Sequence, residues 1–352
     1  MLHRGRSAEK VDVAGASVAG ELGESEPLKS LDRRGFLRGF GAASTLGLIS
    51  PSLLTSGCAG VRPAAGGFEP LRVWGKLGLA DGRFQKPRAV AIDRRDRVYA
   101  VDKTGRIQAF DRDGNFLVGW RTPEIANGKP TGLSFDTAER LMVADTHYFR
   151  VLFYEADGKP LPQLTIGGTL GAAPGELAFV TDCVQAADGC YFTSEYGQND
   201  RLQKFDPDRR PIGVYGVHGE SPEQFSRPQS IALDADGLLW VADSCNHRIA
   251  VIDWRGDQPR WVRTFGSIGS RPGQFRYPYG LLLATDGSLM VAEYGGHRVQ
   301  KLTREGQPLA AWGTPGRELG QLNAPWSLVQ DSQGLIYIVE SGNHRIQCWD
   351  VG

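Results

Sequence analysis

The stretch that decides the fold is IALDADGLLWVADSCNHRIAVID, at residues 231–253. It holds an alternating run over 231–237, an apolar run over 239–243 and a third run over 247–253. The Asp236-Gly237 pair between the first two runs is a typical hairpin turn, and the runs have the length of strands. The stretch therefore predicts three consecutive antiparallel strands joined by short turns.

Units of the same kind recur along the chain. Each unit contains a two-residue step, which is a large apolar residue followed by Gly or, in one unit, by Arg. Consecutive steps lie 46 to 50 residues apart. The steps are Trp74-Gly75, Trp120-Arg121, Ile166-Gly167, Tyr215-Gly216, Phe265-Gly266 and Trp312-Gly313. A Gly-rich loop follows each step, then three strands, and a fourth strand returns to the next step. Four short strands in about 47 residues are typical of a β-propeller blade.

The loop between the second and third strands carries the most specific signal. Residues 241–249 (VADSCNHRI) and 339–347 (VESGNHRIQ) resemble NHL repeats, a family named for the triplet Asn-His-Leu, in which Asn-His-Arg is common. Residues 296–301 and 199–204 are close variants, residues 103–108 are a shortened one, and residues 147–150 are the most divergent. The resemblance covers residues 71–352. It implies an all-β fold, the six-bladed β-propeller.

The two ends of this region complement each other. The sixth unit stops after its third strand, at residues 345–350, and an orphan strand at 71–74 precedes the first unit. A ring closed by pairing these two strands has no exposed sheet edge at the join. We therefore expect one propeller over residues 68–352, closed by its N-terminal strand. Two packed sandwiches built from the same hairpins are the alternative.

Residues 1–67 differ in composition from the rest. Asp32-Arg33-Arg34-Gly35-Phe36-Leu37, followed by a weakly apolar run over 39–54, resembles a twin-arginine (Tat) export signal, with Asp32 where Ser or Thr is usual. The run is too short for a stable membrane span. Residues 54–58 (LTSGC) resemble a lipobox, with Thr55 where Leu is usual, which would place a lipid on Cys58. We expect export to the periplasm or to a lipid anchor, against the alternative of a chance arginine pair before a buried helix.

Composition excludes several classes of protein. A hydrophobic fraction of 41% supports a sizeable core, and 40 basic against 40 acidic residues disfavour nucleic-acid binding. Five cysteines in 352 residues exclude a disulfide framework. Cys183 and Cys190 lie on adjacent strands but diagonal to each other in the expected register, so a disulfide between them is not favoured. We expect a monomer without cofactor.

Each unit places one acidic residue and one arginine on the face formed by these loops. They are Asp102, Asp145, Glu195, Asp243, Glu293 and Glu340, with Arg106, Arg150, Arg201, Arg248, Arg298 and Arg345. A feature repeated six times indicates architecture, so we expect ion pairs that close the loops. His247, His297 and His344 are also equivalent, but side chains away from the axis cannot converge on one metal ion.

Ligand selectivity is expected where the units differ. The residues that follow the proline of each innermost strand, or its equivalent in the third unit, are Arg88, Thr131, Asp182, Gln229, Tyr279 and Trp326. The peptide-amidating lyase is similar in placing zinc-binding His at three such positions, and this chain has none. These six side chains either form a ligand pocket or plug the central channel. Arg88 would hold an anionic group, Asp182 would accept from a donor, and the aromatic pair would offer flat surfaces.

A second irregularity lies near the rim of the same face. Glu195-Tyr196 and Glu293-Tyr294 replace the usual Asp followed by Ser or Thr, and with His147 they are candidate rim residues. Two carboxylates two blades apart would suit acid–base chemistry. The leading hypothesis is an exported binding or scaffold module for an envelope protein, peptide or glycan. The alternative is an enzyme, a lyase or hydrolase of the lactonase or amidating-lyase kind.

Overall fold

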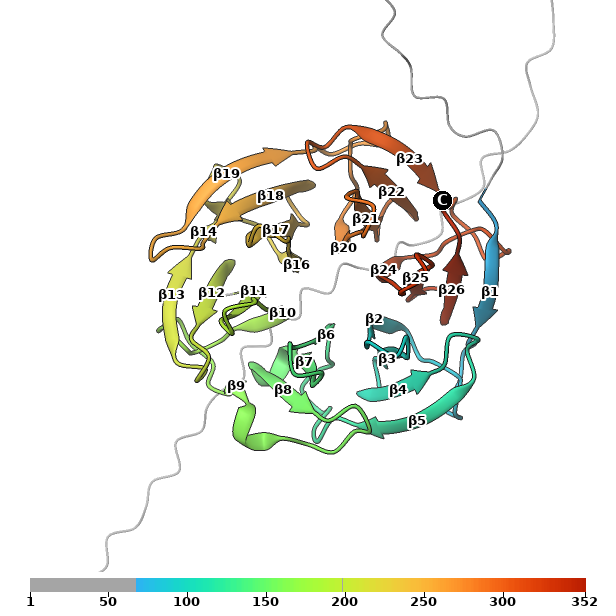
Figure 1. The fold of residues 1–352 in the computed structure, drawn as a ribbon, viewed down its shortest axis with the longest axis horizontal. Helices are drawn as coiled ribbons and strands as arrows, with labels where there is room; N and C mark the ends of the chain where they lie inside the picture. The colour runs from blue at the N-terminus through green and yellow to red at the C-terminus, as the bar shows by residue number, and fades with distance from the viewer. Residues whose placement is uncertain (1–67, 198) are drawn as a thin grey trace, which may run out of the picture. The chain divides into compact units, whose positions relative to one another are not determined.

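Six four-stranded antiparallel sheets surround a central axis (Figure 1). The structure is a computed structural model, and it describes residues 68–197 and 199–352. Arg33, Arg34 and Cys58, which carry the expected export and lipidation signals, lie outside the described residues. Apart from two short 3-10 helices, η1 (Thr146–Tyr148) and η2 (Pro162–Leu164), the described elements are strands. The expected six-bladed β-propeller is confirmed.

The four strands of each blade are ordered from the central axis outward. The innermost strands are β2 (Pro87–Ile92), β6 (Gly132–Phe135), β10 (Phe179–Gln185), β16 (Pro228–Leu233), β20 (Pro278–Leu283) and β24 (Pro325–Gln330). The second strands are β3 (Val98–Asp102), β7 (Leu141–Asp145), β11 (Tyr191–Tyr196), β17 (Leu238–Asp243), β21 (Leu289–Glu293) and β25 (Ile336–Glu340).

Two further strands complete each blade. The third strands are β4 (Arg106–Phe110), β8 (Arg150–Tyr154), β12 (Arg201–Phe205), β18 (Arg248–Asp253), β22 (Arg298–Leu302) and β26 (Arg345–Trp349). The outer strands are β5 (Phe116–Arg121), β9 (Ile166–Gly167), β13 (Pro211–Tyr215), β19 (Arg260–Phe265), β23 (Pro308–Trp312) and β1 (Pro70–Trp74). A two-stranded parallel pair, β14 (Val217–His218) with β15 (Gln224–Phe225), lies between blades 3 and 4.

Burial explains the hydrophobic pattern of the strands. Every residue of β3 is buried, because a second strand is covered on both faces by the neighbouring blades, so it reads as a continuous apolar run. The outer strand β5 alternates between half-buried and exposed residues, since only one of its faces packs. Six apolar clusters fill the interfaces between adjacent blades, so each blade buries its apolar faces against its neighbours.

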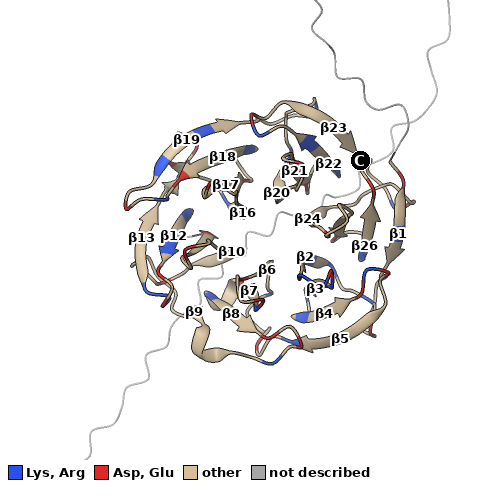
Figure 2. Ribbon diagram, viewed as in Figure 1, with Lys and Arg blue, Asp and Glu red and all other residues tan. Residues whose placement is uncertain are grey.

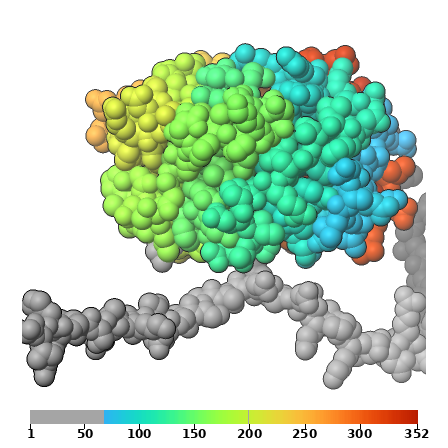
Figure 3. Space-filling view, turned by 90° about the horizontal axis from the view of Figure 1, so that it is seen from below, coloured from blue at the N-terminus to red at the C-terminus, as the bar shows by residue number. Residues whose placement is uncertain are grey.

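The first strand closes the ring as the sequence predicts. β1 pairs antiparallel with β26, with Arg72 opposite Cys348 and Trp74 opposite Ile346. The sheet order β1-β26-β25-β24 joins residues from both ends of the propeller in blade 6. From the side, blue N-terminal residues lie beside red C-terminal ones (Figure 3). The ring of Trp74 packs 5.9 Å from that of Tyr337, centroid to centroid.

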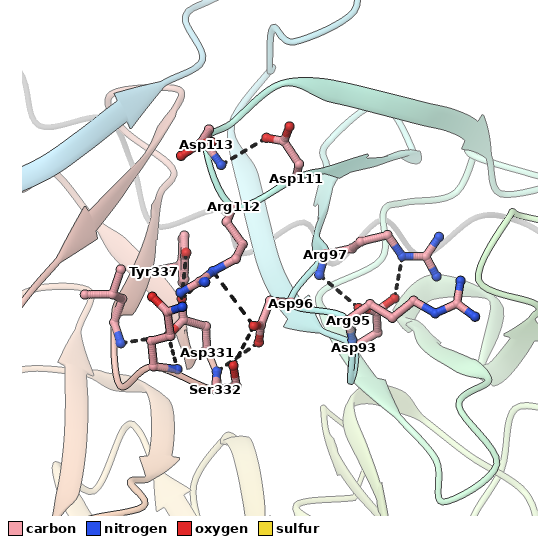
Figure 4. A network of polar contacts seen from close by, with 12 residues as sticks. Asp93, Arg95, Asp96, Arg97, Asp111, Arg112, Asp113, Asp331, Ser332 and Tyr337 are labelled. Atoms are coloured by element: carbon pink, nitrogen blue, oxygen red, sulfur yellow. Dashed lines mark hydrogen bonds and ion pairs between the residues drawn. The ribbon is translucent and has the colours of Figure 1, made fainter.

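A polar network joins blades 1 and 6 a second time (Figure 4). The Arg112 guanidinium of blade 1 lies 2.6 Å from the carboxylate of Asp331 in blade 6, which also accepts a 3.0 Å hydrogen bond from the Tyr337 hydroxyl. Blade 1 also supplies an acceptor to blade 6: the carboxylate of Asp96 accepts hydrogen bonds from the backbone N–H and the hydroxyl of Ser332, at 2.9 and 2.6 Å. Closure therefore rests on strand pairing and on charged hydrogen bonds.

The four cysteines of the described region, Cys183, Cys190, Cys245 and Cys348, are free thiols. Cys183 lies opposite Thr193 in the β10–β11 register, and it is not bonded to Cys190. No helix within residues 68–197 and 199–352 has the length and apolar character needed to cross a membrane.

Candidate functional site

The acidic residues and arginines of the six blades form the expected ion pairs. Figure 2 shows the arginines as blue residues at the start of the third strands. The nitrogen–oxygen distances are 3.2 Å in Asp102–Arg106, 2.9 Å in Asp145–Arg150, 2.5 Å in Glu195–Arg201, 2.7 Å in Asp243–Arg248, and 2.6 Å in both Glu293–Arg298 and Glu340–Arg345. Arg248 also donates to the carbonyl of Gln224 at 2.8 Å, so the pair holds the inter-blade loop.

Glu195 and Glu293 do not lie at the rim. Both side chains are fully buried, and each also accepts hydrogen bonds from a backbone N–H, that of Ala178 or Arg276, and from a glutamine amide of the third strand. Burial outweighs the ion pairs and raises the pKa of both carboxyls. Their hydrogen-bonding capacity is therefore used within the fold, and the two carboxylates do not form the exposed acid–base pair considered from the sequence.

The repeat histidines join each blade to the next. In each case Nδ1 accepts a hydrogen bond from the backbone N–H of the residue before the proline that begins the innermost strand of the next blade. The bonds are Tyr277 to His247 (3.1 Å), Ala324 to His297 (3.0 Å) and Lys86 to His344 (2.8 Å). Asp200 replaces His in blade 3 and accepts from the N–H of Arg227 at 3.1 Å. Within the described ranges, no three His, Cys, Asp or Glu side chains are placed to hold a metal ion.

These bonds predict a loss of stability in mild acid, because a protonated Nδ1 cannot accept. Burial lowers the pKa of His247, His297 and His344, so the unfolded chain, with a histidine pKa of about 6.5, takes up protons first. Their contribution to the free energy of unfolding is complete above pH about 6.5 and falls as the pH drops below it. We expect the triple His→Asp variant, which copies Asp200, to lose less stability than wild type between pH 7.5 and 5.5.

Urea unfolding at the two pH values measures this difference. The buried carboxyls titrate in both proteins and cancel in the comparison. A matched His247→Ala variant removes the acceptor and should cost about 1 kcal/mol at pH 7.5. Equal slopes of stability against pH in wild type and the triple Asp variant would show that the histidines do not act as neutral acceptors.

Four of the six axial side chains close the middle of the channel. Thr131, Gln229, Tyr279 and Trp326 are between 3% and 8% exposed. With Asp182 they line a cavity of about 20 Å³, which holds about one water molecule. The Thr131 hydroxyl lies 2.8 Å from that of Thr146. These side chains fill the centre of the ring. A ligand on the loop face could therefore contact only the small part of each side chain that is exposed.

Asp182 faces the other half of the channel. It lies on the wall of a second cavity, of about 200 Å³, whose lining is apolar apart from this carboxyl and three serines. Its Oδ2 accepts from the Ser230 hydroxyl at 3.0 Å and from the N–H of Ile231 at 3.1 Å, and burial raises the pKa of Asp182 to about 7. Asp182 therefore lines both cavities, the small one that it shares with Tyr279 and Trp326 and the larger one on the other side.

Aromatic rings surround the axis on the loop side. Tyr294 stacks on Tyr279 with centroids 4.6 Å apart, and both meet the ring of Trp326, at 5.3 and 4.9 Å. The guanidinium of Arg88 lies 5.1 Å from the centroid of Trp326. That of Arg227 lies 4.5 Å from Tyr196 and 5.5 Å from Tyr279. We call these six residues the axial cluster: Arg88, Tyr196, Arg227, Tyr279, Tyr294 and Trp326.

His147 lies close to the axial cluster. Its ring packs 5.0 Å from that of Phe179, which in turn lies 5.3 Å from Tyr196, and its Nδ1 is buried without a hydrogen-bond partner in the described region. Burial lowers the pKa of His147, and the positive charges of Arg88, Lys129 and Arg227 lower it further. The neutral ring is therefore an additional polar group for a ligand on this face.

Arg227 is not among the site residues predicted from the sequence. It precedes the proline of β16 with a φ of 57°, a conformation that directs its side chain differently from the residue after the proline. Residues at this position differ among the blades, as those after the proline do: they are Lys86, Lys129, Val180, Arg227, Tyr277 and Ala324. Comparing this second variable position would have revealed it.

Comparisons with known proteins agree with this architecture. The family model of the NHL repeat matches residues 225–252 and 322–349. NHL repeat-containing protein 3 of Homo sapiens and that of Mus musculus are each 39% identical over 66 residues, which are 19% of this chain. The match spans only 18% of the length of these relatives.

Solved structures are similar over most of the propeller. Streptogramin B lyase has a TM-score of 0.56 at 14% identity and covers 80% of this chain and 97% of its own. A gluconolactonase from Xanthomonas campestris has a TM-score of 0.58 at 14% identity and covers 82% and 99%. At such identities the likeness is one of fold. The chain is therefore a six-bladed β-propeller that contains NHL repeats.

Proposed function

We propose that this protein is an exported propeller that binds a ligand at the axial cluster. The observation that carries the proposal is the grouping there of two guanidinium groups that form no ion pair with the described residues and four aromatic rings that pack on them and on each other. Arginine and aromatic side chains gathered in this way are typical of binding sites. The cluster also combines residues that differ from blade to blade, whereas the repeated residues hold the fold.

Capture from envelope extracts tests this proposal with a matched pair of variants. Tyr294 belongs to the axial cluster, whereas Tyr277 is an exposed tyrosine of the same blade that packs on His247, with centroids 4.6 Å apart. The immobilised full chain should retain an envelope protein, peptide or glycan. Tyr294→Ala should lose it, and Tyr277→Ala should keep it. Equal retention by both variants would place the recognition surface elsewhere.

An enzyme is the second candidate, and Asp182 is the observation that favours it. A carboxyl with a pKa of about 7 in a cavity can exchange a proton near neutral pH, as a lyase or hydrolase requires. The lyase and lactonase among the structural neighbours share only the fold with this chain. Asp182→Asn should abolish turnover of any candidate lactone or peptide substrate while leaving capture at the axial cluster intact. Activity that survives Asp182→Asn would remove this candidate.

We also propose export by the Tat route, from the Arg33-Arg34 pair with Phe36 and Leu37 ahead of the apolar run. Replacing both arginines by lysine keeps the charge but loses the guanidinium groups, and should retain the precursor in the cytoplasm. Cell fractionation with an antibody against the propeller measures the result. Export of the double variant at the wild-type level would contradict the proposal.

The lipobox is tested separately. Cys58→Ala should release the exported protein from the membrane fraction, since the thiol is where the lipid would be attached. Membrane attachment that persists in Cys58→Ala would show that another feature holds the protein there.

A further inference from the structure

The two arginines of the axial cluster have no acidic partner. No carboxylate oxygen within residues 68–197 and 199–352 lies within 4.0 Å of the guanidinium of Arg88 or Arg227. Six buried acidic residues of this face are paired with the repeat arginines, as in Glu195–Arg201, and a seventh, Asp200, is paired with His218. Arg227 Nε donates only to the amide oxygen of Gln229, at 3.2 Å, and the side chain of Arg88 makes no hydrogen bond with another described residue.

The positive charges in this cluster reinforce each other. The two guanidinium groups pack on Trp326 and Tyr279, whose ring centroids are 4.9 Å apart. Burial lowers the pKa of Arg88, and the charge of Arg227 contributes to the same shift. Holding two cations together, partly out of water, costs free energy unless an anion neutralises them. The carboxylate of Asp200 accepts from the backbone N–H of Arg227 and pairs with His218, so among the described residues it forms no ion pair with either guanidinium.

Guanidinium groups are suited to oxyanions. Their planar N–H forks match the oxygens of a carboxylate or a phosphate, and rings beside them offer a flat apolar surface. We propose that the axial cluster binds an anionic group, a carboxylate or a phosphate, carried on a flat apolar or ring-shaped portion of the ligand. The inference rests on the proposed function, because it gives the chemical class of the ligand for the same site.

Isosteric probes separate charge from shape. Benzoate, benzamide and benzamidine have nearly the same outline and are negative, neutral and positive at pH 7.5. We expect benzoate to bind the full chain at least tenfold more tightly than benzamide, and benzamidine not to bind. NMR titration at roughly 50 mM salt gives the dissociation constants, and higher salt should weaken benzoate binding selectively. Phenyl phosphate distinguishes the two oxyanions: tighter binding than benzoate assigns the site to phosphate esters, and weaker binding assigns it to carboxylates.

Three variants establish where the preference arises. Arg88→Gln and Arg227→Gln should each reduce benzoate binding tenfold or more and leave benzamide binding nearly unchanged. Arg276→Gln is the matched control, because Arg276 is an exposed arginine of this face that lines a separate inter-blade pocket. Melting temperatures confirm that each variant is folded, and Arg88→Lys should retain part of the preference.

The outcomes separate this inference from the proposed function. Equal affinity for the three isosteres, lost in Trp326→Ala, would overturn the anionic ligand while leaving a binding site at the axial cluster. Preference for benzoate that survives both glutamine variants would place the anion site elsewhere. Failure of wild type to bind any probe, together with equal capture by Tyr294→Ala and Tyr277→Ala, would overturn both.

Discussion

Removal of residues 1–75 is expected to cause aggregation, whereas removal of 1–67 should leave the melting temperature nearly unchanged. The two truncations differ by β1, whose loss exposes the edge of β26 and removes the ring of Trp74 from the core between blades 1 and 6. Trp74 is half-buried, so its loss should cost less than the about 3–5 kcal/mol typical of a fully buried Trp, but the loss of the strand pairing adds to it against the usual 5–15 kcal/mol of domain stability. Thermal unfolding and size-exclusion chromatography measure both effects.

A point variant tests the same closure without truncation. Arg112→Gln weakens the charged contact with Asp331 but leaves β1 paired, so it should lower the melting temperature by much less than loss of the strand. A soluble fragment of residues 76–352 that unfolds cooperatively at the wild-type temperature would show that β1 does not complete blade 6.

Replacing Trp326 by Ala is expected to reduce the affinity of the captured ligand about thirty-fold. An aromatic anchor in a binding site typically contributes about 2 kcal/mol or more, which corresponds to that ratio. Because Trp326 is only 8% exposed and helps to fill the channel, the variant should also have a lower melting temperature. Binding assays and thermal unfolding on the same preparations give both numbers.

Replacing Arg88 distinguishes an effect on ligand affinity from an effect on the melting temperature. Its side chain makes no hydrogen bond or ion pair with the described residues, so Arg88→Gln removes an unneutralised charge and should keep or raise the melting temperature while weakening binding. If the axial side chains only plug the channel, Trp326→Ala and Arg88→Gln would both lower the melting temperature and leave the affinity for the ligand unchanged.

The repeat made most of the fold predictable. A residue that recurs in each unit is expected to have the same structural role in each blade. Asp243 and its equivalents fit this expectation, because they form the ion pairs that close the loops, as in Asp243–Arg248. The orphan strand at 71–74 was informative because only one unit lacked a fourth strand. His247 was predicted not to share a metal ion, but its bond to the next blade depends on contacts between blades that one repeat does not reveal.

The candidate site was less predictable because it depends on how far along the central axis each side chain lies. Asp182 and Trp326 hold equivalent positions in their units, yet Asp182 faces the cavity on the other side and Trp326 supports the axial cluster. Glu195 and the following Tyr196 are adjacent, and only the tyrosine reaches the cluster, since successive residues of a strand point to opposite faces. Side-chain packing around the ring, which repeat alignment does not give, decides which residues a ligand can touch.

Site-specific photo-crosslinking tests the location of the ligand most directly. A photoreactive phenylalanine analogue would replace Tyr294 in the axial cluster or Phe135, whose side chain lines the cavity on the Asp182 side. Both positions are aromatic and half-buried, so the two proteins should fold alike. We predict that the ligand from envelope extracts is crosslinked at position 294 and not at position 135. Crosslinking at 135 alone would contradict ligand binding at the axial cluster.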